Sequence, residues 1–239
     1  MPGLIEAATG ILASSERRVA TAAQNISNAA TPGYRRQVAF THLLDRAAGP
    51  DAHETRATQL SFLSDFAQGK LRDTGRPLDL ALFGPGFLRL RDGESYVYAR
   101  GGSFAIGADG AVVDSMGRVL QQAGGGDLTL EGPAPQIAGD GSVIENGLPV
   151  AMIGLFEPIS PSTLAALGGG LFRAPEAAMQ AAATSVIHQG QLESANVVMS
   201  DEMIAMMAAS RQAEGGARLV QFYDQLIGQA ITTFSRSGK

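Results

Sequence analysis

The chain has 239 residues, of which 45% are hydrophobic, and a net charge of -5 from 18 basic and 23 acidic side chains. It has no cysteine, which excludes disulfide bonds and thiolate chemistry. The negative charge and the lack of any run of about 18 apolar residues give no reason to expect nucleic-acid binding or membrane insertion.

Residues 1–34 are predicted to form a helix that ends in a turn. Apolar residues recur at every seventh position, and small residues occupy positions between them. A stripe this narrow must be buried against another helix, so we interpret the segment as one half of a coiled coil. The Thr31-Pro32-Gly33 sequence ends the helix, because proline disfavours helix in the preceding residue and glycine allows a left-handed turn. The apolar positions are Ile5, Leu12, Val19 and Ile26, and the small ones are Ala8, Ser15, Ala22 and Ala29.

The middle of the chain changes to a period of two residues. Residues 35–77 begin as an extended stretch and are interpreted as a linker into the next domain. In residues 78–173, apolar and polar residues alternate, as in Phe87-Leu88-Arg89-Leu90-Arg91. Asp-Gly or Asn-Gly pairs at 92–93, 109–110, 140–141 and 146–147 are strong hairpin signals. These patterns predict a central antiparallel all-β domain, sandwich or barrel-like, followed by a connector at 174–195.

Residues 196–239 are predicted to form a C-terminal helix, the second half of the coiled coil. Asn196 is a suitable N-cap, and Asp201 and Glu202 lie in the early turns where the helix dipole favours acidic residues. The Gly215-Gly216 pair predicts a close helix crossing rather than a break. The fold class is therefore α+β, with terminal helices that pair as a coiled coil and a β domain between them. The C-terminal seam comprises Leu192, Met199, Met206, Ala213, Val220, Ile227 and Phe234.

Few residues suggest catalysis. The segment Gly101-Gly102-Ser103-Phe104 resembles a nucleophile elbow, but Ala105 stands where the closing glycine belongs. A cell-wall hydrolase needs two carboxylates that face a cleft, and Asp79 and Asp92 are the tempting pair. Both fit better as turn or strand-end residues. The sequence therefore predicts a protein that is not an enzyme, without catalytic, cofactor-binding or metal-binding residues, and leaves a hydrolase as a remote alternative.

Residues 24–34 resemble the N-terminal signature of the bacterial flagellar rod and hook proteins, which places asparagines, a turn and an aromatic residue at fixed offsets after the first helix. Asn25, Asn28, Thr31, Gly33 and Tyr34 match this signature. Segments within residues 68–81, 86–110 and 189–197 resemble three further blocks of the family in the same order. Since these blocks together cover most of the chain, it is identified as a member of the flagellar basal-body rod/hook family.

The resemblance implies a structural subunit of the basal-body rod, most like the proximal rod subunit, with no cofactor. Such a subunit is exported unfolded by the flagellar type III apparatus, and residues 1–13 lack the features of a cleavable signal peptide. It polymerises axially in the periplasm, with copies of itself and other rod proteins, into the hollow drive shaft between motor and hook. A distal rod or short hook-like subunit is the alternative, although residues 210–216 depart from the distal pattern.

We expect the assembly interface to combine the seam positions of both terminal helices with the signature residues that follow the first helix. Its expected members are Ile5, Leu12, Val19, Asn25, Ile26, Asn28, Thr31, Gly33, Tyr34, Leu192, Asn196, Met199, Met206, Val220, Ile227 and Phe234.

Overall fold

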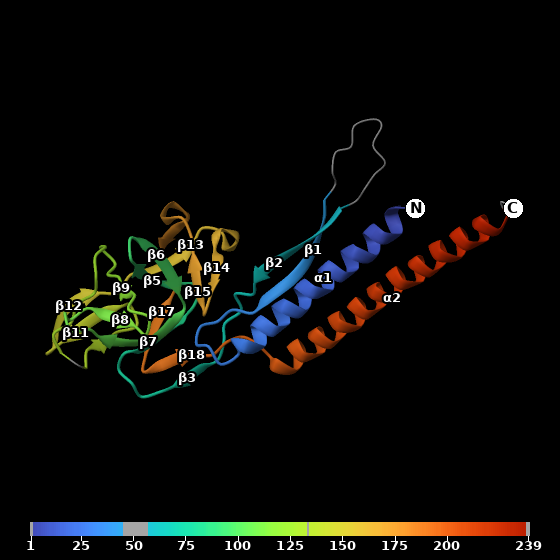
Figure 1. Cartoon of the computed structure of the whole chain (residues 1–239). Coiled ribbons are helices and arrows are strands. Elements are labelled where there is room, and N and C mark those ends of the chain that lie inside the picture. The colour runs from blue at the N-terminus through green and yellow to red at the C-terminus, as the bar shows by residue number, and fades with distance from the viewer. Residues whose placement is uncertain (1, 45–56, 133, 238–239) are drawn as a thin grey trace. The chain divides into compact units, whose positions relative to one another are not determined.

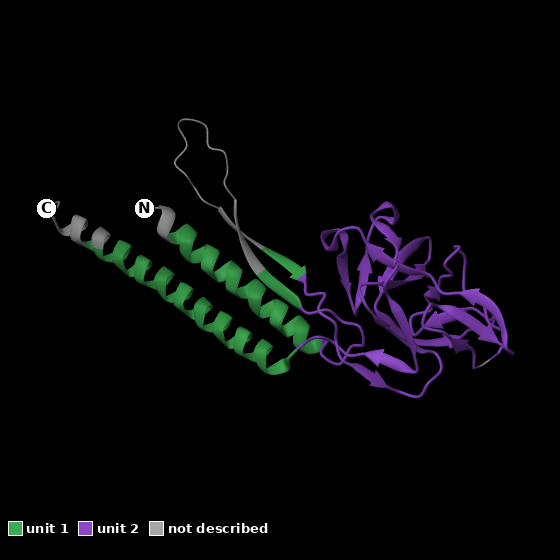
Figure 2. Ribbon diagram, turned by 180° about the vertical axis from the view of Figure 1, so that it is seen from behind, with its two compact units in different colours: residues 1–27, 37–63, 198–239 green, residues 28–36, 64–197 purple. Residues whose placement is uncertain are grey.

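The structure, a computed structural model, describes residues 2–44, 57–132 and 134–237, which form two compact units (Figure 2). Unit 1 comprises residues 1–27, 37–63 and 198–239, and unit 2 comprises residues 28–36 and 64–197. The chain therefore passes between the units after residues 27, 36, 63 and 197. Each unit is assembled from segments that lie far apart in the sequence.

Unit 1 consists of two helices and a strand pair. The helices α1 (Pro2–Ser27) and α2 (Met199–Ser237) lie side by side (Figure 1), and β1 (Gln37–Leu44) pairs with β2 (Ala57–Ser64). Small side chains of α1 are buried at Ala8, Ser15 and Ala22, and α2 buries Ala209 and Gly216. The helices therefore approach each other through small residues, as the N-terminal pattern predicts.

The Gly215-Gly216 pair does not break α2. A Cβ atom built on Gly216 would lie 3.2 Å from side-chain carbons of both Ile11 and Leu12, whereas one built on Gly215 would meet nothing within 4 Å. Such close approach is possible because glycine has no side chain. The predicted close crossing of the helices at this position is confirmed.

Unit 2 is a body of short strands. Its strands are β3 (Leu71–Asp73), β4 (Asp79–Phe83), β5 (Phe87–Asp92), β6 (Ser95–Ala99), β7 (Gly101–Ile106), β8 (Val112–Asp114), β9 (Val119–Leu120), β10 (Gln136–Ile137), β11 (Ser142–Glu145), β12 (Leu148–Met152), β13 (Leu155–Pro158), β14 (Ala165–Gly168), β15 (Leu171–Arg173), β16 (Met179–Ala181), β17 (Val186–Gln189) and β18 (Gln191–Glu193). Two short 3₁₀ helices, Pro161–Thr163 and Glu176–Ala178, lie among the later strands.

The strands pair antiparallel, which confirms the α+β class with an antiparallel β-rich body. The largest sheet runs in the order β14-β15-β6-β5-β9-β8-β7-β4-β17, and β13 and β16 branch from it at β5. Smaller sheets are β10-β11-β12 and β18-β3. The path of the large sheet ends at β14 and β17, so the sheet does not close. The prediction of a barrel-like domain is wrong in that respect.

Two apolar clusters form the core of unit 2. The larger cluster is built from alternate residues of the central strands, including Leu80, Leu88 and Leu120, each with 0% exposure. The smaller is aromatic, and the rings of Phe87 and Phe172 meet edge to face at 5.6 Å. Burial of apolar surface stabilises a fold by roughly 25 cal/mol per Å², so these clusters hold the short strands together.

Two segments differ from the prediction. Residues 35–77, expected as an extended linker, carry β1, β2 and β3, and the connector at 174–195 carries β16, β17 and β18. The pairing of β17 with β4 and of β18 with β3 joins residues more than a hundred positions apart. Such strands are stabilised by distant partners rather than by local pattern, which is why the sequence alone did not reveal them.

We expect Gly216→Leu to destabilise unit 1 by about 1–3 kcal/mol, because its side chain must displace Ile11 and Leu12. The matched control Gly215→Ala should stabilise α2 by roughly 1 kcal/mol, because alanine is the better helix former. Thermal unfolding of the full chain, followed by helical circular dichroism, measures both changes. Equal melting temperatures of the two variants would contradict the close crossing of α1 and α2 at Gly216.

Candidate functional site

The residues that match the signature after α1 form a tight turn. The Thr31 amide donates to the Asn28 carbonyl at 2.9 Å, and the Thr31 hydroxyl lies 3.3 Å from the Asn28 side-chain oxygen. The Tyr34 amide closes the turn on the Thr31 carbonyl at 3.3 Å. The Gly33 amide donates at 2.8 Å to the carbonyl of Glu193, which lies on β18. This turn of unit 2 is therefore hydrogen-bonded to a strand near the other end of the sequence.

Directly after this turn, a buried carboxylate holds two buried guanidinium groups. Glu193 Oε1 accepts hydrogen bonds from Arg35 Nη1 and from the Gly69 amide, each at 2.7 Å. Glu193 Oε2 accepts from Arg100 Nε at 3.3 Å. The three side chains are between 0% and 2% exposed. The buried charge cluster of Arg35, Arg100 and Glu193 therefore joins three distant parts of unit 2.

Backbone carbonyls complete the coordination of the two cations. Arg35 Nη1 also donates to the Ala67 carbonyl at 3.0 Å, and Arg100 donates to the carbonyls of Gly86 and, at 3.2 Å, Leu82. Burial lowers the pKa of Arg100 to about 10, and the negative charge of Glu193 acts in the opposite direction. Arg100 is therefore still charged at neutral pH. Two positive charges and one negative charge remain inside this cluster.

Gly69 shows how closely the chain passes this cluster. A Cβ atom on Gly69 would lie 1.9 Å from the carbonyl oxygen of Ser194 and 3.3 Å from the side chain of Glu193. Any side chain here would therefore push β18 away from the segment before β3 and break the hydrogen bond from the Gly69 amide to Glu193.

Asn196 has a different role from the predicted helix N-cap. Its side-chain oxygen accepts from the Arg36 amide at 2.7 Å, and its amide group donates to the carbonyls of Asp65 and Ala67 at 2.8 and 3.0 Å. Helix α2 begins only at Met199, and the Asp201 and Glu202 amides donate to the Val198 carbonyl. The N-cap prediction is wrong because this side chain instead fastens three segments of unit 2.

Asn25 and Glu202 form a polar pair in unit 1. The Asn25 amide nitrogen donates to Glu202 Oε2 at 3.0 Å and to the Gln37 carbonyl at 2.8 Å, and its oxygen accepts from the Gln37 amide at 2.9 Å. Asn25 is 0% exposed and Glu202 is 2% exposed. One side chain thus links the end of α1, the start of β1 and the start of α2, and it fixes the register of the two helices.

The large apolar residues of the predicted seam fall into four groups. Leu12, Val19, Ile26, Met206 and Val220 are half-buried. Exposed members are Ile5, Met199 and Ile227, at 40%, 49% and 42%. The prediction that Leu192 belongs to a helical seam is wrong, because Leu192 lies on the strand β18. The side chain of Phe234 lies outside the described residues.

Further apolar side chains of α2 are also exposed. Met203, Ile204, Met207 and Phe222 are between 51% and 62% exposed, and Leu226 is 48% exposed. Sequence reasoning missed the buried charge cluster. The sequence held a signal for this cluster, because Arg100 and Glu193 lie within segments that resemble the family, close to Gly101 and Gly190.

Neither a metal-binding group nor a membrane-spanning helix is found in the described parts of the chain. No three His, Cys, Asp or Glu side chains among these residues lie together as metal ligands would. No helix in the same ranges has the length and hydropathy needed to cross a bilayer.

Known proteins resemble this chain along most of its length. Residues 188–233 match a family model described as the C-terminal region of flagellar basal body rod FlgEFG proteins. The flagellar basal-body rod protein FlgF of Caulobacter vibrioides is 30% identical over 225 residues, covering 90% of this chain and 91% of the relative. FlgF of Rhizobium meliloti is 28% identical over 240 residues, 93% of each chain. FlgG of Borreliella burgdorferi is 29% identical over 267 residues, covering 96% of this chain and 97% of the relative.

We expect Glu193→Gln to destabilise unit 2 by about 3–5 kcal/mol, because it leaves two buried cations without a counter-charge. Glu176→Gln is the control, since its carboxylate is 63% exposed and its pairing with Arg89 contributes at most about 1 kcal/mol. Urea unfolding of both variants measures the difference. If Glu193→Gln lowers the free energy of unfolding no more than the control does, the cluster is not stabilised by the charge of Glu193.

Replacing Asn25 by alanine should destabilise unit 1 by about 1–3 kcal/mol, because the backbone groups of Gln37 and the carboxylate of Glu202 lose a buried partner. Glu16→Ala, at an exposed position of α1, is the control. Hydrogen exchange of the α1 amides measures the loss of protection. Unchanged exchange in the Asn25 variant would refute the link that we assign to this residue.

Proposed function

Because this chain belongs to the flagellar basal-body rod protein family, a family of structural rod subunits, we propose that it forms part of the proximal rod. The relatives named FlgF, at 30% and 28% identity, support the proximal assignment. The relative named FlgG, 29% identical over 96% of the chain, keeps the distal rod as the second candidate. In either position the chain is a structural component of the basal body.

The terminal helices are the two halves of a coiled coil in this proposal. On α2 the buried and half-buried positions include a series at spacings of four and three residues, as a heptad seam requires. The buried and half-buried positions of α1 include a series with the same spacing. The α2 seam comprises Glu202, Met206, Ala209, Ala213, Gly216, Val220 and Tyr223, and the α1 seam comprises Ala8, Leu12, Ser15, Val19, Ala22 and Ile26.

The exposed apolar side chains of α2 are the observation that carries the proposed assembly. A helix that is covered on one face only should have a polar outer face. Instead Met203, Met207 and Phe222 are 51%, 56% and 59% exposed, and Ile227 is 42% exposed. Helices of neighbouring subunits would cover these residues, because buried apolar surface contributes roughly 25 cal/mol per Å².

In the assembled rod, the helices would form the inner layer around the channel, and the β-rich body would form the outer wall. Export through the type III apparatus requires an unfolded chain in a narrow channel. The absence of cysteine is compatible with that route, because no disulfide can cross-link the chain. The subunit would then polymerise axially in the periplasm, with copies of itself and other rod proteins.

A structural role is favoured over the hydrolase alternative. Asp79 is 1% exposed and lies 3.5 Å from the guanidinium of Arg76, so it is not open to a polysaccharide. Asp92 is exposed at the end of β5. A zymogram with the purified chain separates the two functions, because a clear zone in a peptidoglycan gel would require an enzyme.

Immunogold labelling of isolated basal bodies tests the proposed position. We expect label on the rod segment nearest the inner membrane. Label near the outer rings would replace the proximal by the distal assignment, and label beyond the outer membrane would indicate a hook-like subunit. Basal bodies that contain the other rod proteins but no label would overturn the proposal.

We expect Leu12→Asp and Ile227→Asp to abolish incorporation into basal bodies while unit 2 stays folded. Leu12→Asp places a charge at a half-buried seam position, and Ile227→Asp places one on the exposed apolar surface that neighbouring helices would cover. Arg18→Asp, an exposed position of α1, is the control and should be incorporated normally. Motility in soft agar and blotting of isolated basal bodies provide the readouts. Normal motility with either helix variant would contradict the coiled-coil role.

A further inference from the structure

The strand β12, the last in the sheet β10-β11-β12, presents apolar side chains to solvent. Leu148, Val150 and Met152 are 68%, 50% and 48% exposed. Val150 is the extra residue of a bulge, because Val143 pairs with Ala151 and Ile144 pairs with Pro149. Ala151 packs on the core. The Ala123 amide donates to the Met152 carbonyl, and among the described residues the strand partner of residues 148–151 is β11.

Acidic side chains surround this strand. Asp109, Glu131 and Glu145 line a hollow of about 540 Å³ together with Leu148 and Val150. Glu145 accepts from the amides of Gly132 and Glu131 at 2.8 and 3.3 Å, which leaves its negative charge uncompensated. In the described ranges no lysine or arginine forms a salt bridge with these three carboxylates. The surface therefore fits an extended segment that carries cations and adds to the edge of the sheet.

The strand β3, together with Lys70 before it, is an extended segment that carries cations. In the described residues β18 is the strand that pairs with it. Lys70 and Arg72 are exposed at alternate positions and are in none of the salt bridges of the described residues. Figure 1 shows β12 and β3 at separate places in unit 2, so the two strands of one copy do not meet.

We propose that the β12 edge of one copy binds the β3 edge of the next copy. This contact rests on the proposed function, because it names the surface through which that function's polymer is built. Backbone pairing would supply strand hydrogen bonds, none of them donated by Pro149, which has no amide hydrogen. Lys70 and Arg72 would approach Glu131, Glu145 and Asp109. Because the two surfaces differ, the contact is head to tail, and head-to-tail contacts repeat into rings or open helical filaments rather than closing as a dimer.

Charge reversal of the full-length chain in cells tests this contact. Glu131→Lys is chosen because only the backbone amide of Glu131 takes part in a described hydrogen bond. We expect Glu131→Lys and Lys70→Glu each to lower the amount of the chain in isolated basal bodies about tenfold, because like charges then face each other. Their combination should restore it. Glu94→Lys, an exposed site with the same change of charge, should have no effect.

The outcomes separate this contact from the function on which it depends. If the wild-type chain is present in basal bodies and the double variant is no better than the single ones, the function stands and the contact is wrong. If the wild-type chain is absent from basal bodies, both are wrong. Loss caused by misfolding is recognised by a lowered melting temperature of the purified single variant, and the cross-linking experiment then decides.

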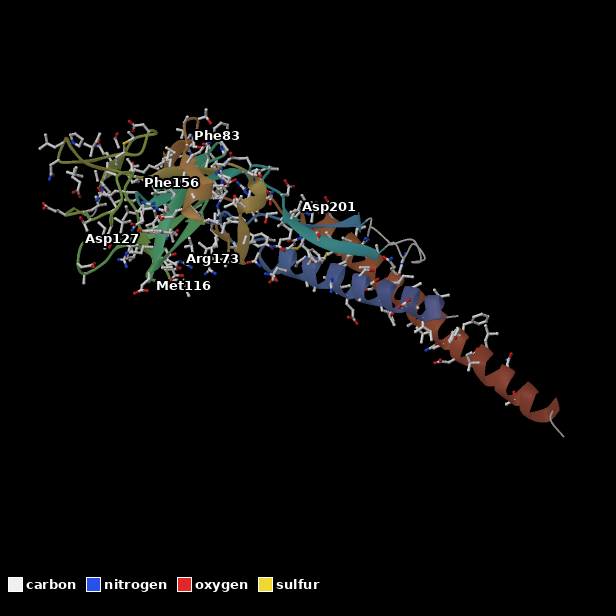
Figure 3. The ribbon with its side chains drawn as sticks, turned by 90° about the horizontal axis from the view of Figure 1, so that it is seen from above. Phe83, Met116, Asp127, Phe156, Arg173 and Asp201 are labelled. Atoms are coloured by element: carbon white, nitrogen blue, oxygen red, sulfur yellow. The ribbon has the colours of Figure 1, made fainter. Side chains whose placement is uncertain are left out.

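Cross-linking is decisive because the chain has no cysteine of its own. We expect Val150→Cys combined with Lys70→Cys to give a ladder of disulfide-linked copies in oxidised basal bodies. Met116→Cys combined with Lys70→Cys is the control, since Met116 is 76% exposed on the turn between β8 and β9 (Figure 3). Dimers from Val150→Cys alone would indicate a symmetric contact, and a cross-link to another rod protein would indicate a different partner. Either result, or no ladder, overturns the proposal.

Discussion

A single carboxylate, that of Glu193, accepts hydrogen bonds from two buried guanidinium groups and from the Gly69 amide. These donors come from the turn after α1, from the segment before β3 and from the residue between β6 and β7. The Glu193 backbone also holds the turn, through the amide of Gly33. Because these segments share few strand hydrogen bonds, the order of unit 2 at this end depends on one ionised side chain that is shielded from water.

The helix pair of unit 1 combines a seam of small residues with large apolar residues on its outside. Ala8, Ala22 and Ala209 are buried, whereas Met203, Ile204 and Phe222 are more than half exposed. Small seam residues allow close approach, but they bury little apolar surface. Large apolar residues of the seam, such as Leu12 and Met206, are only half-buried. Helices of neighbouring subunits, as proposed above, would cover the large side chains that remain exposed.

Much of this architecture follows from the sequence, because its signals are local. The seven-residue period located both helices, and Asn146-Gly147 marks a hairpin in which both residues have positive φ angles. The strands β17 and β18 were missed because distant partners, not their own patterns, stabilise them. Leu192 continued the helical period by coincidence on β18. The buried charge cluster was also missed, since charged residues ordinarily indicate solvent and only the packing of distant segments reverses that expectation.

Buried charges are often replaceable by apolar residues without loss of stability, so their presence in unit 2 needs a reason. Here the guanidinium groups donate to the carbonyls of Ala67, Leu82 and Gly86, and Glu193 accepts from the Gly69 amide. The carbonyls of Ala67 and Leu82 also accept from the side chains of Asn196 and Gln68. Apolar side chains of the same size would therefore remove the partners of the Gly86 carbonyl and the Gly69 amide, at a cost of about 1–3 kcal/mol each. The charges therefore satisfy the backbone where β strands end and the chain turns. The buried charge cluster thus allows irregular segments of unit 2 to pack together away from water. The exposed apolar surface of α2 would remain available for the proposed assembly.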